Sequence, residues 1–254
     1  MHALINMLPG VPAVPGVPAL NPANLRPVYP LRPEPSALEH WLFGGGADSL
    51  VGLKGRSLAP ASAMPAFAAN YLATVPDGLN GLISTIVEPG VYTQCAVIRY
   101  DAVSADRRII FGTAQGGSGD GRGIMLDNRD NWGFNTLARP NASATGMPQG
   151  ALTLMRDQWI FFALSVDVVA NKWRCWVGGS AQTVEVTPAS QYLPSTRGLA
   201  LGNAYYTASA PNTFRQSLAV AEMIVFSEYV SPAALSEIYA RSKERMASRG
   251  IVVY

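Results

Sequence analysis

The chain has 254 residues, of which 48% are hydrophobic and only 14% are charged, and its formal net charge is +2. This length and apolar content suffice for one large β domain with a sizeable core. The low net charge excludes a broad basic surface for nucleic acid, and no apolar run approaches the roughly 18 residues of a membrane-spanning helix, so neither partner is expected.

The first segment of the chain is rich in proline. Residues 9–20 read PGVPAVPGVPAL, and four prolines keep a spacing of three residues: Pro9, Pro12, Pro15 and Pro18. Because polyproline II has three residues per turn, these prolines would lie along one edge of an extended rod. The proline density then falls, which predicts an extended arm at residues 1–37 and a folded domain at residues 38–254. The arm is either a semi-rigid spacer or a segment that docks into a groove of another protein.

After the arm, short apolar runs alternate with Gly, Asn, Asp and Pro, which is typical of an all-β sandwich. The sequences DNRDN (127–131) and VANK (169–172) predict tight hairpin connections. Cys95 and Cys175 lie in two of the apolar runs, so we expect both to be buried free thiols. The clearest strands, in chain order, are expected at residues 92–100, 108–113, 123–127, 159–168, 172–177, 183–187, 198–201 and 217–226.

One helix is predicted near the end of the chain. Ser231 is suited to cap it, and Pro232 is suited to its first position. Leu235, Ile238 and Tyr239 form an apolar stripe at helical spacing, so the helix should lie on the sandwich through that stripe. The arginines and lysine of its last turns stand where the helix dipole favours cations.

Three segments resemble one known family of folds. WIFFALSVDVVANKWRCWVGG (159–179) is similar to the central hairpin of concanavalin A-like and laminin-G-like domains, and AEMIVFSEYVSPAALSEIYA (221–240) is similar to their last strand and helix. HWLFGGGADSLVGLKG (40–55) resembles their opening strand and its Asp-containing turn. The resemblance spans residues 38–247. It implies an all-β, two-sheet antiparallel jelly-roll sandwich with one short C-terminal helix, whose concave face or rim loops hold a glycan or a protein partner.

The sequence offers no convincing catalytic group, so no catalytic residue is predicted. Its two histidines are His2 and His40, and only His40 lies in the expected domain. The glycine-rich stretch at 116–123 lacks the Lys and Ser/Thr of a phosphate-binding loop. Glu222 and Glu228 would be about 20 Å apart on one strand, which is too far for a glycosidase pair. A glycan-degrading enzyme remains the alternative.

Two loops carry the groups that sugar binding needs, namely aromatic faces with amides or carboxylates nearby. They are DNRDNWGFN (127–135) and GNAYYTASAPN (202–212). The predicted ligand-contacting residues are Asn128, Asp130, Trp132, Asn203, Tyr205 and Tyr206. Aromatic residues at strand ends also complete cores and oligomer interfaces, which is the competing interpretation.

The same family often binds calcium through carboxylates and carbonyls at the rim. The densest oxygen cluster here is Asp127, Asn128, Asp130 and Asn131. Its spacing is not that of an EF-hand, and turn chemistry accounts for these residues. No metal and no other cofactor is therefore predicted, with calcium at this turn as the alternative.

A jelly roll behind a proline-rich arm, with few lysines and no secretion signal, resembles proteins of bacteriophage or prophage particles. The resemblance implies a non-enzymatic virion structural protein, associated with a tail or fibre and made in the cytoplasm of the bacterial host. Residues 1–37 would anchor it to other virion proteins, and the jelly roll would bind host-surface polysaccharide or a neighbouring subunit. A homo-oligomer is expected, with a trimer favoured. The alternatives are a capsid decoration protein without a ligand and a glycan-degrading tail enzyme.

Overall fold

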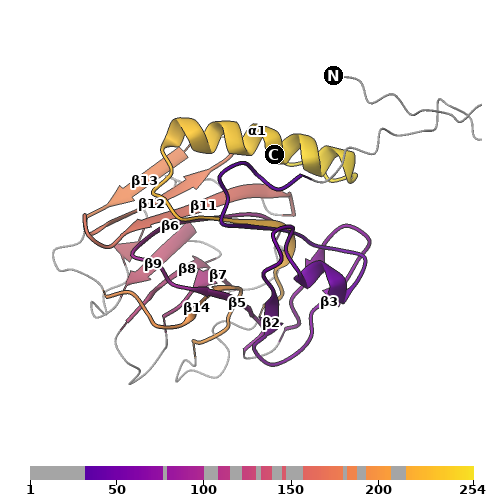
Figure 1. Cartoon of the computed structure of the whole chain (residues 1–254), viewed down its shortest axis with the longest axis horizontal. Coiled ribbons are helices and arrows are strands. Elements are labelled where there is room, and N and C mark those ends of the chain that lie inside the picture. The colour runs from indigo at the N-terminus through magenta and orange to yellow at the C-terminus, as the bar shows by residue number, and fades with distance from the viewer. Residues whose placement is uncertain are drawn as a thin grey trace, which may run out of the picture. The chain divides into compact units, whose positions relative to one another are not determined.

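A computed structural model describes residues 32–76, 79–99, 108–114, 122–129, 133–138, 145–146, 157–179, 182–187, 193–206 and 216–254. Two antiparallel sheets lie face to face in it (Figure 1). Sheet 1 has the strand order β13-β12-β11-β6-β15-β4-β3, with β1 also paired to β15, and sheet 2 has the order β10-β9-β8-β7-β14-β5-β2. The predicted two-sheet antiparallel sandwich is therefore confirmed.

The strands of sheet 1 are β1 (Glu39–Leu42), β3 (Ala66–Phe67), β4 (Leu72–Ala73), β6 (Val91–Arg99), β11 (Ile160–Asp167), β12 (Lys172–Val177), β13 (Gln182–Val186) and β15 (Ala219–Phe226). Those of sheet 2 are β2 (Leu58–Pro60), β5 (Leu82–Val87), β7 (Arg108–Gly112), β8 (Ile124–Arg129), β9 (Gly133–Ala138), β10 (Thr145–Gly146) and β14 (Gly198–Leu201). A 3₁₀ turn, η2 (Ala47–Leu50), follows β1. Strands β12 and β14 begin and end at the predicted residues, and the turns after β8 and β11 each join neighbouring antiparallel strands.

Sheet 1 is covered on both faces, which explains its nearly continuous apolar strands. Along β6, Tyr92, Ala96 and Ile98 point into the core between the sheets. Cys95 and Val97 alternate with them and join a second apolar cluster beneath the C-terminal helix. Side chains that alternate along a strand thus bury apolar surface on both sides of it.

The two cysteines lie on opposite faces of sheet 1. Cys95 is paired with Ala163 of β11, and Cys175 is paired with the next residue, Leu164. Successive residues of a strand point to opposite faces, so the two thiols are separated by the sheet itself. Both are buried and free, which confirms the expectation. Burial raises the pKa of both thiols.

The helix α1 (Pro232–Ser248) covers the outer face of sheet 1 (Figure 1). Ser231 caps it, with its hydroxyl accepting from the Ala234 N–H at 3.3 Å, and Pro232 stands at its first position. Leu235 and Ile238 are buried in the apolar cluster beneath it, as the stripe predicts. No helix among the described residues is long and apolar enough to cross a bilayer.

The folded domain includes residues that the sequence assigned to the arm. The compact unit begins at Pro33. Glu34 and Ala37 are buried, and the Lys54 ammonium donates to the Ala37 carbonyl. Pro9, Pro12, Pro15 and Pro18 lie outside the described residues, so the extended arm stays a prediction.

Candidate functional site

The two loops predicted to contact a ligand leave sheet 2 at the same end. Strands β8 and β14 flank β7, and each is antiparallel to it, so their C-terminal ends point the same way. Asn128 of β8 is paired with Arg108, and the Gly202 N–H that follows β14 donates to the carbonyl of Ile110. The two strands are separated by β7 alone, or about 10 Å. Asp130, Trp132 and the side chain of Asn128 lie outside the described part of the chain.

The tyrosine loop, residues 202–206, is fixed by Asn203. The Asn203 side chain accepts from the Tyr206 N–H at 3.0 Å and donates to the Tyr206 carbonyl at 3.1 Å. Its backbone N–H donates to Asn80, and Asn203 itself is buried. Gly202 precedes it with φ +74°, a conformation that favours glycine. Asn203 therefore positions Tyr206 and has its own side-chain groups bonded within the loop.

Both tyrosines of the loop are partly exposed. Tyr206 packs against Ile109 and Met125, which lie on the face of sheet 2 that points away from the core. The Tyr205 hydroxyl donates to the Gly198 carbonyl at 3.0 Å, and the Arg197 guanidinium lies 5.5 Å from the Tyr205 ring centroid. Partly exposed rings held in this way can stack on the apolar face of a sugar, with an arginine beside them as a donor.

A buried carboxylate that the sequence analysis missed holds the start of β14, next to Arg197. Glu88 accepts from the Thr113 hydroxyl at 2.8 Å, from the Ser195 N–H at 2.6 Å and from the Tyr92 hydroxyl at 3.2 Å. These donors come from both sheets and from the segment before β14. Glu88 therefore acts as a structural anchor beneath the outer face of sheet 2.

A second set of buried polar side chains, which the sequence analysis also did not predict, lies between sheet 1 and α1. This charge network contains Glu34, His40, Glu222, Arg241, Ser242 and Arg245. Arg245 donates to Glu34 at 2.6 Å and to Glu222 at 2.7 Å, while Arg241 donates to Glu34 at 2.7 Å. The hydroxyl of Ser242 also donates to Glu222. Two arginines thus face two buried carboxylates.

Both ring nitrogens of His40 have partners, namely the Glu34 backbone and the Glu222 carboxylate. Its Nδ1 accepts from the Glu34 backbone N–H at 2.9 Å, so the proton lies on Nε2, which contacts Glu222 at 2.8 Å. Burial alone would raise the pKa of Glu222, but the His40 hydrogen bond and the Arg245 charge outweigh it and lower this pKa to about 2. Glu222 is therefore a structural carboxylate that stays ionised, and His40 is fully occupied by its neighbours.

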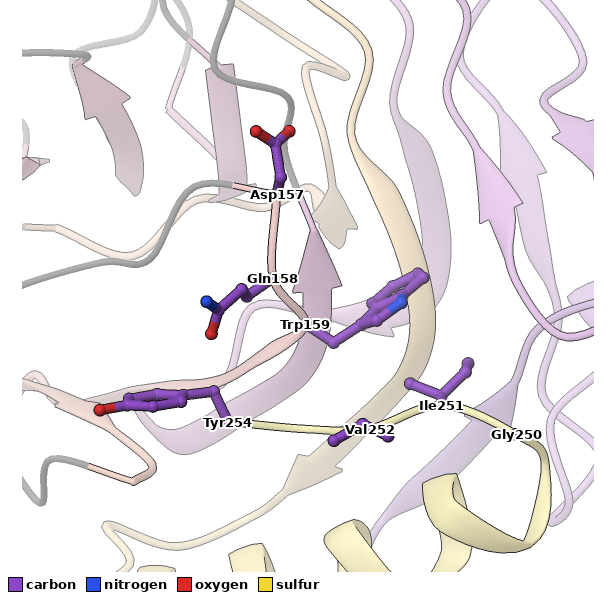
Figure 2. A pocket seen from close by; sticks show the side chains of 7 residues that line it. All are labelled: Asp157, Gln158, Trp159, Gly250, Ile251, Val252 and Tyr254. Carbon is purple, nitrogen blue, oxygen red and sulfur yellow. The ribbon is translucent and has the colours of Figure 1, made fainter.

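A hollow of about 280 Å³ opens where the C-terminal segment meets the start of β11 (Figure 2). Its lining consists of Asp157, Gln158, Trp159, Gly250, Ile251, Val252 and Tyr254. The Tyr254 N–H donates to the Trp159 carbonyl at 2.8 Å, which holds the segment against the strand. In Figure 2, Gln158 and Tyr254 point to one side of this contact, and Trp159 and Ile251 point to the other. The Tyr254 side is open, since Tyr254 is 45% exposed.

Among the residues whose placement is described, no group of three His, Cys, Asp or Glu side chains is arranged to hold a metal ion. The side chains of Asp127, Asn128, Asp130 and Asn131 lie outside that set. Calcium at this turn stays an untested alternative.

No family model and no curated protein matches this sequence. Among solved structures, the chain is similar to the Trypanosoma rangeli sialidase, with a TM-score of 0.55 and 12% identity over 83% of this chain and 33% of that one. It is also similar to the botulinum neurotoxin serotype D binding domain, with a TM-score of 0.56 and 12% identity over 83% of this chain and 52% of that one. A mosaic serotype C/D receptor-binding domain gives a TM-score of 0.58 at 11% identity, over 83% and 52%. The chain thus spans about a third to a half of these proteins, and the likeness shows a shared β-sandwich fold.

Proposed function

We propose that this chain is a non-enzymatic binding module whose jelly roll holds a glycan through the tyrosine loop. The observation that carries the proposal is a pair of partly exposed tyrosines, with Tyr206 fixed by Asn203 and Tyr205 held beside Arg197. Rings that are held before the ligand arrives lose little conformational entropy on binding. A module of this kind also agrees with its structural neighbours, which include the receptor-binding domain of botulinum neurotoxin D and a sialidase in complex with sialic acid.

The buried polar groups support a binding role over a catalytic one. Glu34, Glu88 and Glu222 each accept several hydrogen bonds from their own chain, and both thiols have raised pKa values in an apolar setting. Thiols of this kind are poor nucleophiles. These groups are all buried, so we assign them to the stability of the fold.

The proposal extends to a place in a bacteriophage particle. The three-residue proline register of the arm suits a rod that lies in a groove of another virion protein or pairs with sister arms. The protein would then be a tail-associated or fibre-associated homo-oligomer, with a trimer favoured. Removal of residues 1–31 should leave a folded domain that no longer enters particles, and normal incorporation of that variant would contradict the anchor.

A glycan array probed with the full chain, with and without calcium, tests ligand binding. The matched variants are Tyr206→Ala and Val169→Ala, since Val169 is 85% exposed at the turn between β11 and β12, at the opposite end of the sandwich. We expect signal on at least one host-surface glycan, lost in Tyr206→Ala and kept in Val169→Ala. A blank array would favour a decoration protein without a ligand, and release of reducing ends from host polysaccharide would establish the glycan-degrading alternative.

A further inference from the structure

Arg99 is held on two aromatic rings at the end of β6. The side chain extends from the face of sheet 1 that also carries Cys95 and Val97. The guanidinium carbon lies 5.0 Å from the Trp159 ring centroid and 5.4 Å from the Tyr71 ring centroid. The two rings meet edge to face at 5.3 Å. Both attract a cation through their faces, so the guanidinium has a fixed place.

Arg99 differs from other arginines around sheet 1 because, within the described residues, neither a carboxylate nor a carbonyl accepts from its guanidinium. Arg241 and Arg245 face carboxylates, and Arg249 donates to two carbonyls. In the described part of the chain, no carboxylate lies within ion-pair distance of Arg99, and its Nε is shielded from water without an acceptor. A guanidinium has five N–H donors in a planar fork, and leaving a shielded one unpaired is unfavourable. A bound anion would therefore supply the hydrogen-bond acceptor that the Arg99 guanidinium lacks.

The ring beneath Arg99 also borders the hollow at the C-terminal segment. Trp159 contacts Arg99 through its ring and contributes to the lining of the hollow. On the open side of the hollow, the Tyr254 ring lies near the Gln158 amide (Figure 2). Arg99 therefore lies on the Trp159 side of the strand contact, and the Tyr254 ring and the Gln158 amide lie on the other side.

We propose that Arg99, Tyr71 and Trp159 form a subsite for the carboxylate of an acidic saccharide. A guanidinium fork binds a carboxylate through two parallel hydrogen bonds, which gives both strength and orientation. A carboxylate is also the group that a neutral sugar lacks, so this subsite selects acidic glycans. The inference rests on the proposed glycan-binding function, but it uses residues that the tyrosine loop does not contain.

Titration calorimetry of the full chain with trigalacturonate and its neutral methyl ester tests the subsite. Short oligomers of glucuronate-containing and mannuronate-containing polysaccharides serve as further acidic probes. We expect at least one acidic probe to bind at least about tenfold more tightly than its neutral form, and to bind more weakly as salt is added. No preference for any acidic probe would overturn the proposal.

The matched variants are Arg99→Gln, which loses the charge, Arg99→Lys, which keeps the charge but loses the fork, and Arg56→Gln at an exposed arginine elsewhere. Both Arg99 variants should lose most of the acidic preference, and Arg56→Gln should keep it. If Arg99→Gln fails to fold, Arg99→Lys keeps a cation over both rings and carries the test. Unchanged acidic binding by Arg99→Lys and Arg99→Gln would refute the subsite.

The same titrations separate this inference from the proposed function. Neutral glycan binding that depends on Tyr206, without acidic preference, would remove the subsite and leave the tyrosine loop standing. Acidic binding that depends on Arg99 and not on Tyr206 would support the subsite and remove the tyrosine loop.

Discussion

Replacing Glu222 with glutamine tests the charge network beneath α1. Glutamine keeps the shape of the side chain but removes the negative charge that faces Arg245. One carboxylate oxygen of Glu222 accepts from both His40 and Arg245, and the other accepts from Ser242. The amide can satisfy these three neighbours only in part, and Arg245 keeps Glu34 as its one counter-charge.

The size of the effect follows from the pKa of Glu222, which is lowered from its ordinary 4.5 to about 2. At about 1.4 kcal/mol per pKa unit, the folded state favours the ionised form by about 3 kcal/mol. Breaking one side of a buried ion pair costs about 3–5 kcal/mol, which agrees. Because the pKa is lower in the folded state, this stabilisation is complete above pH 4.5 and is lost as the pH falls toward 2.

Urea unfolding followed by circular dichroism measures this directly. At pH 7, Glu222→Gln should lower the free energy of unfolding by about 3 kcal/mol. Between pH 4.5 and pH 2, the wild type should lose stability more steeply than the variant. Glu228→Gln is the matched control, because Glu228 is exposed two residues beyond β15. A variant within about 0.5 kcal/mol of the wild type at pH 7, with the same pH profile, would refute the reasoning.

Three further predictions use the same structure. Removing residues 1–31 should leave the free energy of unfolding unchanged, whereas removing residues 1–35 also deletes Glu34 and should lower it by about 3 kcal/mol in urea titrations. Asn203→Ala should cost about 1 kcal/mol and weaken glycan binding, because both backbone groups of Tyr206 lose their partner; equal binding by calorimetry would show that the loop needs no such support. Iodoacetamide should label neither cysteine at pH 8 until urea unfolds the chain, and fast labelling of the folded protein would contradict the burial that raises both pKa values.

The strands and the helix are predictable from sequence because their signals are local. Strand β12 has an apolar run between turn residues, and α1 has Ser231 and Pro232 at its start with Leu235 and Ile238 at helical spacing. Each of these features lies within a few neighbouring residues, where propensity and periodicity act.

The charge network is not predictable in the same way because its members are far apart in the chain. Glu34 and Arg245 meet only after β1, β15 and α1 have packed together. One signal is present, since Glu222 interrupts the apolar strand AVAEMIVF and so needs a buried partner. The helix arginines, which the sequence assigns to the helix dipole, in fact pair with these carboxylates.

The candidate binding loops are likewise predictable from the sequence only in part. The turn chemistry of residues 127–131 and the aromatic pair at Tyr205 and Tyr206 are visible in the sequence. The two loops lie at the same end of sheet 2 because of the strand order β8-β7-β14. This strand order is not encoded in any local sequence pattern. The sequence also does not show that the Asn203 side chain is used within its own loop.

Calorimetric titration of the full chain with the strongest glycan from the array tests the binding role most directly. The wild type and Val169→Ala should bind with equal affinity, and Tyr206→Ala should bind at least about tenfold more weakly while remaining folded at the temperature of the titration. Equal affinity of all three proteins, or no binding by the wild type, would contradict glycan recognition by the tyrosine loop.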